Sequence, residues 1–451
     1  MLDSVFQPFI EKSPISVMAR GLLERALNPV KLNEWFKRTA FSQYTRKLLF
    51  SSVFQMMNEV VFATKPSIHA AYQSLQEELD VSVQSVYNKL NALEPTTSAE
   101  LVRYTSEEIT PVIKAMKGAR DPLLPGFRIK MLDGNCIEAT ERRLKVLRHT
   151  ASAPLPGKSL VVFDPELDLV IDVFPCEDGH TQERALLNQI IPTIKANDAW
   201  IGDRNFCVLS FLFGMAKKDA FFIIRQHKGL PFDEISPMRS QGKSATGDVF
   251  EQRIEIKNEN DKVLKLRRIR VCLNEPTRDG ETEIFILTNL PARVAKAKKI
   301  AKIYQKRWMI ETLFQRLEKN FHSEINTLGY PKAALFGFCI ARVAYNIMSG
   351  VKAALRGVHG AEKIDNEVSD YYIAGEISAV SRGMMIAIPE EHWSVFLSLT
   401  PTQLARVFIK LAKNVKLPAF KKHPRGPKKP QVKPEWDPKH PHVSTARLLA
   451  G

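Results

Sequence analysis

The sequence predicts a mixed α/β domain between two helical regions, and three observations indicate this fold class. From about residue 123 to residue 226, three strand-like apolar runs are followed by helix, strand, helix and strand signals in turn. From 226 to 283 the segments are charged and alternate with period two, as in an antiparallel sheet with one wet face. Before and after this part, apolar residues recur at helical spacing. We therefore expect a mixed α/β sheet that carries an all-β insertion, with helical regions on either side.

Residues 1–122 are predicted to be helical. Two short amphipathic runs lie between residues 67 and 93, and Ser82 is the expected N-cap of the second. Two helices joined by a tight turn fit a helix-turn-helix, whose second helix enters a major groove of DNA. An ordinary helical hairpin fits the pattern equally well.

The α/β domain is expected to span residues 123–350. FRIKMLDGNCI is strand-like, with a turn expected at Gly134–Asn135, and KSLVVFD and LDLVIDVFP predict two further strands. TQERALLNQIIPTI predicts a helix capped by Thr181. The segments that follow are predicted to form a strand, a helix, a strand, two antiparallel strands and another strand: AWIGDRNF, SFLFGMAKK, AFFIIRQ, VFEQRIEIK, KLRRIRVCL and EIFILTNL. A single long helix is expected from about 294 to 321.

The remainder of the chain divides into a helical region, 351–418, and a basic, proline-rich tail, 419–451. The prolines and lysines of the tail prevent a packed core, so we expect an extended segment. The tail is either simply solvated or binds phosphates without sequence preference.

The charge of the chain points to a polyanionic partner. Its 451 residues carry a formal net charge of +16, and the isoelectric point is about 9.5. For a soluble protein, such an excess of Lys and Arg favours binding to nucleic acid.

The cysteines and the apolar segments indicate the compartment. Five cysteines lie far apart without a C-x-x-C pair, which argues against a zinc ribbon or a disulfide framework and favours a reducing compartment. The N-terminus lacks the pattern of a secretory signal. The most apolar stretch, AALFGFCIARVAYNIMSGV, contains Arg342 and predicts a buried helix rather than a membrane span. We expect a cytoplasmic protein without a membrane partner.

Three acidic residues are candidates for chemistry. Asp133 lies in a strand of apolar and basic residues, and Asp203 ends the apolar run AWIGD. An aspartate at the end of a buried strand is costly unless it is paired or bound to a metal ion. A turn-capping role also explains either aspartate taken alone, and Glu311 taken alone is an ordinary helical glutamate.

The helix around Glu311 carries an unusual stripe of side chains. Helical spacing places these residues on one face: Tyr304, Arg307, Trp308, Glu311, Gln315 and Glu318. Such a stripe suits DNA, with a carboxylate for metal, a guanidinium for phosphate and rings for an unpaired base. A partly buried helix with snorkelling charges is the alternative.

Together, DGN at 133–135, GDRNF at 202–206 and Y-x-x-R-x-x-x-E at 304–311 resemble the catalytic segments of bacterial insertion-sequence transposases with the Y-R-E-K signature. The order agrees, and so do the gaps of 70 and 108 positions between successive acids. The resemblance covers roughly residues 126–350. It implies an RNase H-like, five-stranded mixed sheet with a β-rich insertion in the second gap.

The resemblance also implies a DDE-type transposase that uses two Mg²⁺ ions, with Mn²⁺ as a substitute. Asp133 would bridge the ions, and Asp203 and Glu311 would each hold one. The implied DNA contacts are Tyr304, Arg307, Trp308, Lys319 and Arg204, although a structural salt bridge explains Arg204 as well. The implied partners are double-stranded DNA, as terminal inverted repeats and as target, and a second copy of the chain in a synaptic homodimer. The implied location is the bacterial nucleoid.

The sequence departs from the signature at one position. Glu318 stands where the family has Lys, so Lys319 or Arg316 substitutes or the contact is missing. If a flipped base is stacked on Trp308, the insertion would offer Phe250 or Phe285 as the second ring. A metal-dependent nuclease that does not join DNA, and a non-catalytic DNA-binding descendant, are the alternative functions.

Overall fold

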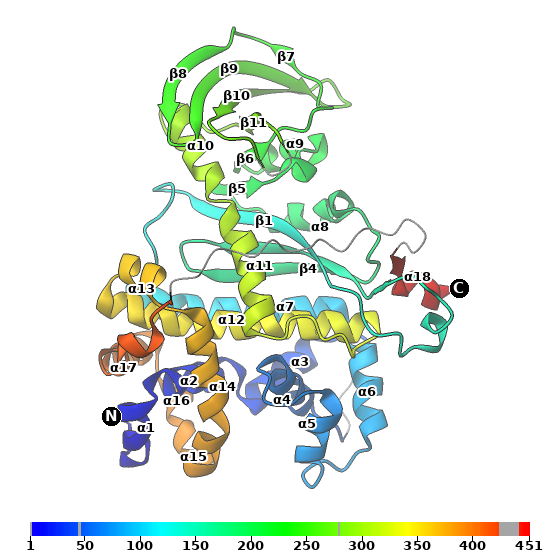
Figure 1. Ribbon diagram of the computed structural model, residues 1–451, viewed down its shortest axis with the longest axis vertical. Helices are drawn as coiled ribbons and strands as arrows, with labels where there is room; N and C mark the ends of the chain where they lie inside the picture. Colours follow the sequence, from blue (N-terminus) through cyan, green and yellow to red (C-terminus); the bar gives the residue numbers. More distant parts are fainter. Residues whose placement is uncertain (1, 44–46, 278–279, 424–441) are drawn as a thin grey trace.

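The structure is a computed structural model that describes residues 2–43, 47–277, 280–423 and 442–451. A long mixed sheet forms the middle and one end of the molecule, and helices form the other end (Figure 1). Within the described residues the sheet has ten strands, in the order β4-β3-β1-β5-β6-β11-β10-β9-β7, with β8 paired to β9. The predicted α/β class with helical N- and C-terminal regions is confirmed.

The half of the sheet that carries the candidate acids has five strands. Antiparallel pairs join β1 to β3 and β3 to β4, and parallel pairs join β1 to β5 and β5 to β6. The mixed pattern is the one expected for this part of the chain. The five strands are β1 (Arg128–Cys136), β3 (Lys158–Asp164), β4 (Leu169–Cys176), β5 (Asp198–Gly202) and β6 (Phe221–Arg225).

The turn predicted at Gly134–Asn135 is wrong. Strand β1 continues to Cys136, and Gly134 and Asn135 pair with Leu160 and Ser159 of β3. The sequence pair Gly-Asn is common in tight turns, but here a neighbouring strand supplies the pairing partners. Asp133 therefore lies within a strand and not at its end.

The β-rich segment continues the same sheet. Strand β11 pairs antiparallel with β6, and β10 pairs with both β11 and β9. The sheet therefore extends beyond the five strands that the resemblance implied. These strands are β7 (Asp233–Glu234), β8 (Arg239–Ser244), β9 (Gly247–Lys257), β10 (Val263–Leu273) and β11 (Glu283–Thr288).

The segment TQERALLNQIIPTI does not form the single helix that its sequence predicts. It forms a 3-10 turn at Glu183–Leu186, the short helix α8 (Leu187–Ile190) and another 3-10 turn at Ile191–Thr193. Pro192 lacks an N–H group and prevents a regular helix from continuing there. Thr181 is not an N-cap, because its hydroxyl donates to Asp178. Helix α9 (Leu209–Lys217) lies where it is predicted.

The long helix predicted for 294–321 is two helices, α10 (Ala297–Gln305) and α11 (Trp308–Asn320). Between them the backbone makes tight turn bonds, from the N–H of Arg307 to the carbonyl of Tyr304 and from Met309 to Lys306. The break lacks the usual causes, a proline or a glycine, so the sequence carries no signal for it. Tyr304 and Glu311 therefore do not share the face of one helix.

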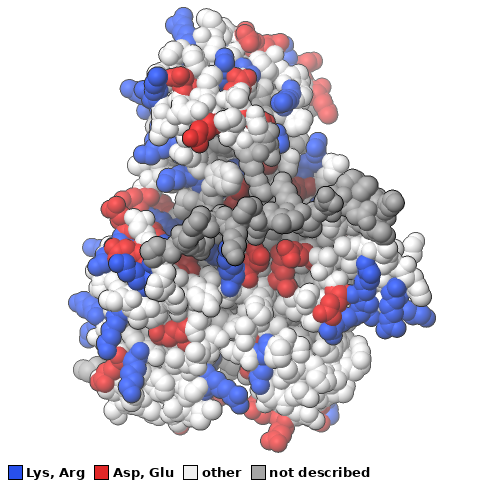
Figure 2. Space-filling view, in the orientation of Figure 1, with Lys and Arg blue, Asp and Glu red and all other residues white. Residues whose placement is uncertain are grey.

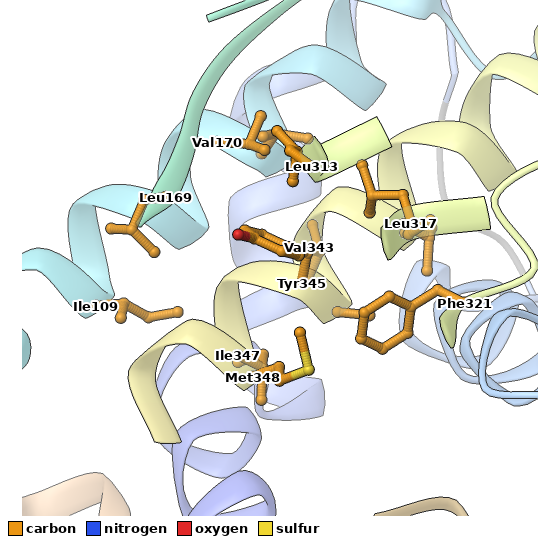
Figure 3. Packing of buried hydrophobic residues seen from close by; sticks show 14 of the residues in the cluster. Ile109, Leu169, Val170, Leu313, Leu317, Phe321, Val343, Tyr345, Ile347 and Met348 are labelled. Carbon is orange, nitrogen blue, oxygen red and sulfur yellow. The ribbon is translucent and has the colours of Figure 1, made fainter. Parts of the chain in front are cut away.

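Helix α12 (Pro331–His359) is the centre of the main hydrophobic core. Figure 3 shows Val343, Tyr345 and Met348 of α12 among side chains of α7 (Pro95–Ala115), β4 and α11. By length and composition α12 is the one helix of the described residues that could cross a membrane, but it is buried inside the protein. It is a core helix, as the sequence predicts.

The described residues of the N-terminal region form helices joined by loops and turns, and the two predicted helices between 67 and 93 are present. Ser82 caps the second, because its hydroxyl accepts from the N–H of Ser85. The helices before α7 are α1 (Gln7–Lys12), α2 (Pro14–Leu27), α3 (Pro29–Thr39), α4 (Phe50–Val61), α5 (Ile68–Leu75) and α6 (Val83–Ala92).

The C-terminal helices pack beside the N-terminal ones in Figure 1. They are α13 (Ala361–Glu367), α14 (Asp370–Ala387), α15 (Glu390–Trp393), α16 (Val395–Ser398) and α17 (Pro401–Lys413). Most of the predicted basic tail, 424–441, lies outside the described residues.

The end of the chain is not extended, contrary to the prediction. Strand β12 (Val443–Ser444) pairs in parallel with β2 (Pro154–Leu155), and α18 (Thr445–Ala450) follows. An ion pair of 2.8 Å between Arg447 and Asp178 adds a polar contact that composition alone does not reveal.

Candidate active site

Asp133 lies on β1, which pairs with β3 on one side and with β5 on the other. The register pairs Asp133 with Val161 of β3 on one side, while Met131 pairs with Ile201 of β5 on the other. Its side chain is only 17% exposed. Burial raises the pKa of Asp133 to about 7, and the charges of Asp203 and Glu311 act in the same direction, against the opposing effect of Arg307. Burial is thus the main cause of the raised pKa of Asp133, and the two other acids add a smaller effect of the same sign.

Asp203 follows directly after β5. Because Met131 pairs with Ile201 in parallel, Asp133 and Asp203 both lie two residues beyond a matched pair, at the same edge of neighbouring strands. The Asp203 carboxylate accepts from the N–H of Asn205 at 2.8 Å and caps a 3-10 turn. The capping role that the sequence allowed is present, and it fixes the carboxylate on the side of Asp133.

Glu311 reaches the site from the first turn of α11. Arg307 Nη2 donates to Glu311 Oε1 at 2.5 Å, and Arg307 Nη1 donates to Asp133 Oδ2 at 3.3 Å. One guanidinium therefore holds two of the three acids. The break between α10 and α11 places Arg307 at the start of the helix, where it can reach both.

The donors fit a hard divalent cation, since three carboxylates offer the oxygen ligands that Mg²⁺ prefers. In the described part of the chain, however, no three His, Cys, Asp or Glu side chains are already gathered as a metal-binding group. The guanidinium of Arg307 bonds to both Asp133 and Glu311 and so occupies oxygens of two of the three acids. The chemistry of the donor set fits the metal, and a metal held by all three acids would replace these Arg307 contacts.

Tyr304 is buried rather than surface-exposed. Its side chain is 8% exposed, and burial raises its pKa to about 12, although the nearby charges of Arg307 and Arg225 act the other way. Trp308, by contrast, is 59% exposed and lies 5.8 Å from the Arg307 guanidinium. Of the two aromatic residues that the sequence singles out, only Trp308 offers an open ring to a ligand.

The structure narrows the search for a replacement of the signature lysine. Arg316 is held by Asp370 of α14 at 3.0 Å, so it serves the fold and is not available to a phosphate. Lys319 is exposed one position after Glu318, near the far end of α11. Lys319 remains the candidate.

Arg204 forms a structural salt bridge, which is one of the two roles that the sequence allows for it; the other is a DNA contact. Its Nη1 lies 3.1 Å from Glu281 Oε1. The two candidate rings of the insertion are also engaged by arginine: the guanidinium of Arg270 lies 5.4 Å from the Phe250 ring, and that of Arg268 lies 3.8 Å from the Phe285 ring.

Glu183 is a neighbour of the site that the sequence does not single out, because it lies in the segment predicted to be a regular helix. Its carboxylate packs directly over Gly134, and a Cβ atom at position 134 would overlap Glu183 Oε1. Asn205 Nδ2 donates to the other carboxylate oxygen at 3.3 Å. A fourth carboxylate therefore borders the residues next to Asp133 and Asp203.

Basic side chains are spread over the face of the molecule drawn in Figure 2. Figure 2 shows Lys and Arg on the β-rich end of the molecule and on both flanks below it, interspersed with acids. This distribution favours contact with an extended polyanion over contact with a small one.

Comparisons with known proteins give the family of the central region. The family of the transposase DDE domain matches residues 151–347, a span that holds Asp203 and Glu311 but begins after Asp133. The chain is 24% identical over 255 residues to the transposase for insertion sequence element IS421 of Escherichia coli, covering 49% of this chain and 64% of that protein. The same identity and length hold for InsL of insertion sequence element IS186A of Escherichia coli strain K12, with 65% of that protein covered. The match thus spans somewhat less than two thirds of these relatives.

Among solved structures, the piggyBac transposase synaptic complex with hairpin DNA aligns with 86% of this chain and 85% of that chain, at 10% identity and a TM-score of 0.40. The family match and the two bacterial relatives support the resemblance to bacterial insertion-sequence transposases of the DDE type, while the Y-R-E-K signature stays a prediction. Residues 151–347 are thus similar to the transposase DDE domain, and the chain is similar to bacterial insertion-sequence transposases.

Proposed function

We propose that the protein is a DNA transposase that cuts and joins the ends of its own insertion sequence. The observation that carries the proposal is the placement of Asp133, Asp203 and Glu311. Asp133 lies on β1, Asp203 follows the parallel neighbour β5 at the matching position, and Arg307 at the start of α11 bonds to both Asp133 and Glu311. Two aspartates on neighbouring parallel strands and a glutamate from a covering helix suit phosphodiester chemistry with divalent metal ions.

The three carboxylates would hold two Mg²⁺ ions, or Mn²⁺ in their place, with Asp133 shared between them. Bound there, the metal would activate the attacking oxygen and stabilise the leaving one. The residues of the chain would do the rest: Asp203 is fixed by the N–H of Asn205, and Arg307 would turn from Glu311 to a DNA phosphate.

The DNA would lie across the exposed side of α11. Trp308 offers its ring to a base and Lys319 its charge to the backbone, while the buried Tyr304 hydrogen-bonds to Arg307. In the first step water attacks a phosphorus, the P–O bond to the 3′-oxygen breaks, and that oxygen leaves as a 3′-hydroxyl. In the second step this hydroxyl attacks a phosphorus of the other strand or of target DNA, forms a new phosphodiester bond and displaces the 3′-oxygen of the attacked strand as a hydroxyl.

Recognition of the terminal inverted repeats would fall to α5 and α6, with α6 in the major groove. Bringing two transposon ends together implies a homodimer on DNA. An enzyme that acts on chromosomal DNA would work at the bacterial nucleoid, in the cytoplasm. These assignments rest on the capped helix pair and on the basic charge of the chain.

The test combines the purified protein, DNA carrying the flanks of its own gene, and Mg²⁺ or Mn²⁺. We expect cleavage at the repeats and joining to a target plasmid, both lost in Asp133→Asn and Glu311→Gln. Asp261→Asn, in a solvent-exposed turn of the insertion, is the matched control and should keep both activities.

The outcomes separate the alternatives. Cleavage without joined products would make the protein a nuclease. If the wild type binds DNA tightly without cleaving it, the protein is a non-catalytic DNA-binding protein. Glu318→Lys, at the signature position, is then the first substitution to test for a return of cleavage.

A further inference from the structure

A cavity lined largely by cations opens beside the candidate acids, where the β-rich segment meets β6. It has a volume of about 490 Å³, and its walls include Arg204, Arg225, Lys228, Arg268, Glu281 and Phe285. Arg204 follows Asp203 directly in the chain, and Arg225 ends β6, the parallel neighbour of β5. Arg225 and Asp203 both influence the pKa of the buried Tyr304. The cavity and the acids therefore share one region of the protein.

Glu281 occupies the cationic side of this cavity. It accepts from Arg204 Nη1 at 3.1 Å and from Arg225 Nη2 through its other oxygen. The hydrogen bond from Arg225 is the main reason that the pKa of Glu281 lies below its ordinary value. Two guanidinium groups that converge on one oxyanion are the arrangement by which proteins bind phosphate.

A second cation in the cavity wall has neutral partners. Arg268 lies between the rings of Phe232 and Phe285, with its Cζ atom 4.8 and 3.8 Å from their centroids. Its Nε and Nη1 atoms donate to Gln226 and Gln252, at 2.7 and 3.0 Å. Within the parts of the chain that the structure describes, no acid lies within ion-pair distance of Arg268. Burial lowers the pKa of Arg268, and the more distant charges of Glu234 and Glu283 act in the opposite direction.

Among the described residues, Glu281 is the carboxylate that forms ion pairs with cations of this wall. The other described acid of the cavity, Glu283, lies 2.8 Å from Arg270, on the neighbouring strand β10. Four described cations thus line the cavity, and Glu281 pairs with two of them. An anion that replaced Glu281 would find two arginines already in place.

We propose that this cavity binds a phosphate group of DNA on Arg204 and Arg225, and that Glu281 occupies this position as an internal competitor in the free protein. The choice of a DNA phosphate, rather than another anion, rests on the proposed function, because the cavity adjoins the acids that would cut the phosphodiester. DNA then displaces the Glu281 carboxylate, and Arg268 and Lys228 add positive charge at the wall.

The test is a binding measurement in EDTA with a short duplex oligonucleotide of arbitrary sequence, so that no cleavage is needed. Glu281→Gln keeps the shape of the side chain and removes its charge, and we expect it to bind roughly tenfold more tightly than the wild type. Glu255→Gln makes the same charge change on β9, where Glu255 faces Lys265 at 3.6 Å, and should change the affinity less than about twofold.

Combining the substitutions tests whether the gain in DNA affinity depends on Arg204 and Arg225. In a chain that carries Arg204→Gln and Arg225→Gln, the gain from Glu281→Gln should vanish, because the two effects share the same partners. Glu281→Asp, which keeps the charge on a shorter arm, should fall between wild type and Glu281→Gln, and it serves as the second variant if Glu281→Gln lowers the melting temperature.

The proposal is overturned if Glu281→Gln binds no more tightly than Glu255→Gln, or if its gain persists without the two arginines. These results are separate from the test of the proposed function. If the wild type cleaves its own ends but Glu281→Gln binds DNA no more tightly, only the proposal of an internal competitor fails. If Glu281→Gln binds more tightly through the two arginines but the protein never cleaves DNA, the proposed transposase activity fails and the phosphate site stands.

Discussion

Arg307 Nη1 lies 3.3 Å from Asp133 Oδ2, so that a cation of the protein stands beside the carboxylate predicted to bridge two metal ions. The same guanidinium holds Glu311 at 2.5 Å. In the metal-free protein Arg307 thus supplies part of the positive charge that a metal would bring. A metal ion bound by these carboxylates would compete with Arg307 for the same oxygens, and this competition can be measured without any DNA.

Replacing Arg307 by Gln should change how the protein responds to Mg²⁺. Without the guanidinium, the acids repel one another, and we expect the metal-free variant to lose about 1–3 kcal/mol of stability. Mg²⁺ should then raise its melting temperature by more than it raises that of the wild type. Arg143→Gln, which removes an exposed arginine paired with Glu141, is the control. Equal Mg²⁺ shifts in all three proteins would contradict the assignment of these acids as ligands.

The raised pKa of Asp133 predicts a pH dependence of stability in EDTA. A carboxyl group whose pKa is about 7 in the folded protein, and near 3.8 when unfolded, binds more protons in the folded state between these values. Its contribution therefore falls as the pH rises through this window.

Asp133→Asn removes the titrating carboxyl group, and with it the loss of stability that accompanies rising pH. At pH 8 the variant should be more stable than the wild type by about 2–4 kcal/mol, and at pH 4 the two should be nearly equal. Urea unfolding at both pH values gives the comparison. A difference that does not change with pH would mean that Asp133 is not the group that titrates.

Gly134→Ala should disturb Glu183 rather than the strand. The new methyl group would overlap the Glu183 carboxylate, which is the movable end of a flexible side chain. We expect a loss of about 1–2 kcal/mol in the single variant. Adding Glu183→Ala should recover most of it, because the obstacle is then gone. Additive losses in the double variant would show that the backbone of β1, and not Glu183, resists the methyl group.

The sequence named the residues of the candidate site more fully than it gave their geometry. Asp133 and Asp203 attracted notice as acids in or beside buried strands, and Glu311 was added by the resemblance of the three motifs to a known family. The strands on which the two aspartates depend were also predictable, since their apolar runs have the right length and spacing.

The remaining features depend on contacts between distant segments. Nothing near Lys306 marks the end of α10, so the relative placement of Tyr304 and Trp308 was not predictable. Glu183 reaches Gly134 only because Pro192 and the 3-10 turns shorten the expected helix. The sequence allows Arg316 as a phosphate ligand, because its ion pair with Asp370 comes from a helix far along the chain.

The predicted recognition helix α6 can be tested by its exposed polar face. Gln84 and Asn88 are exposed one turn apart, and Gln84 Nε2 donates to Asn88 Oδ1 at 2.8 Å. If α6 reads the terminal repeats, Gln84→Ala with Asn88→Ala should weaken binding to the repeats by about 1–3 kcal/mol and leave binding to arbitrary DNA unchanged. Gln73→Ala, on the exposed side of α5, should do neither. Unchanged binding to the repeats would favour the ordinary helical hairpin.

Asp168 anchors the helix that carries Glu311, although it lies far from the acids in the sequence. It is 1% exposed, at a turn position with φ of 60°. It accepts from the hydroxyl of Tyr345 at 2.7 Å and lies 3.0 Å from Arg120. Burial alone would raise the pKa of Asp168, but the charges of Arg120, Arg356 and Lys352 hold it well below its usual range.

These contacts continue to α11. Lys352 pairs with Asp370 at 2.6 Å, and Asp370 holds Arg316 of α11 at 3.0 Å. A group with a lowered pKa contributes its stability above the unfolded value, and the contribution is lost as the pH falls toward the folded one. At pH 7, therefore, the whole contribution of Asp168 is present.

Asp168→Asn should cost about 3–5 kcal/mol at pH 7, because it leaves buried cations without their acid. Asn tolerates the positive φ at this position, so the loss would be electrostatic and not conformational. Asp261→Asn, at a φ of 52° in an exposed turn, separates the two causes and should cost less than about 0.5 kcal/mol. Urea unfolding gives the free energies, and metal-dependent cleavage at a temperature where both variants remain folded shows whether α11 has shifted. A loss of cleavage in the folded Asp168→Asn variant would mean that this buried network holds Glu311 in place, whereas full cleavage would confine the network to stability.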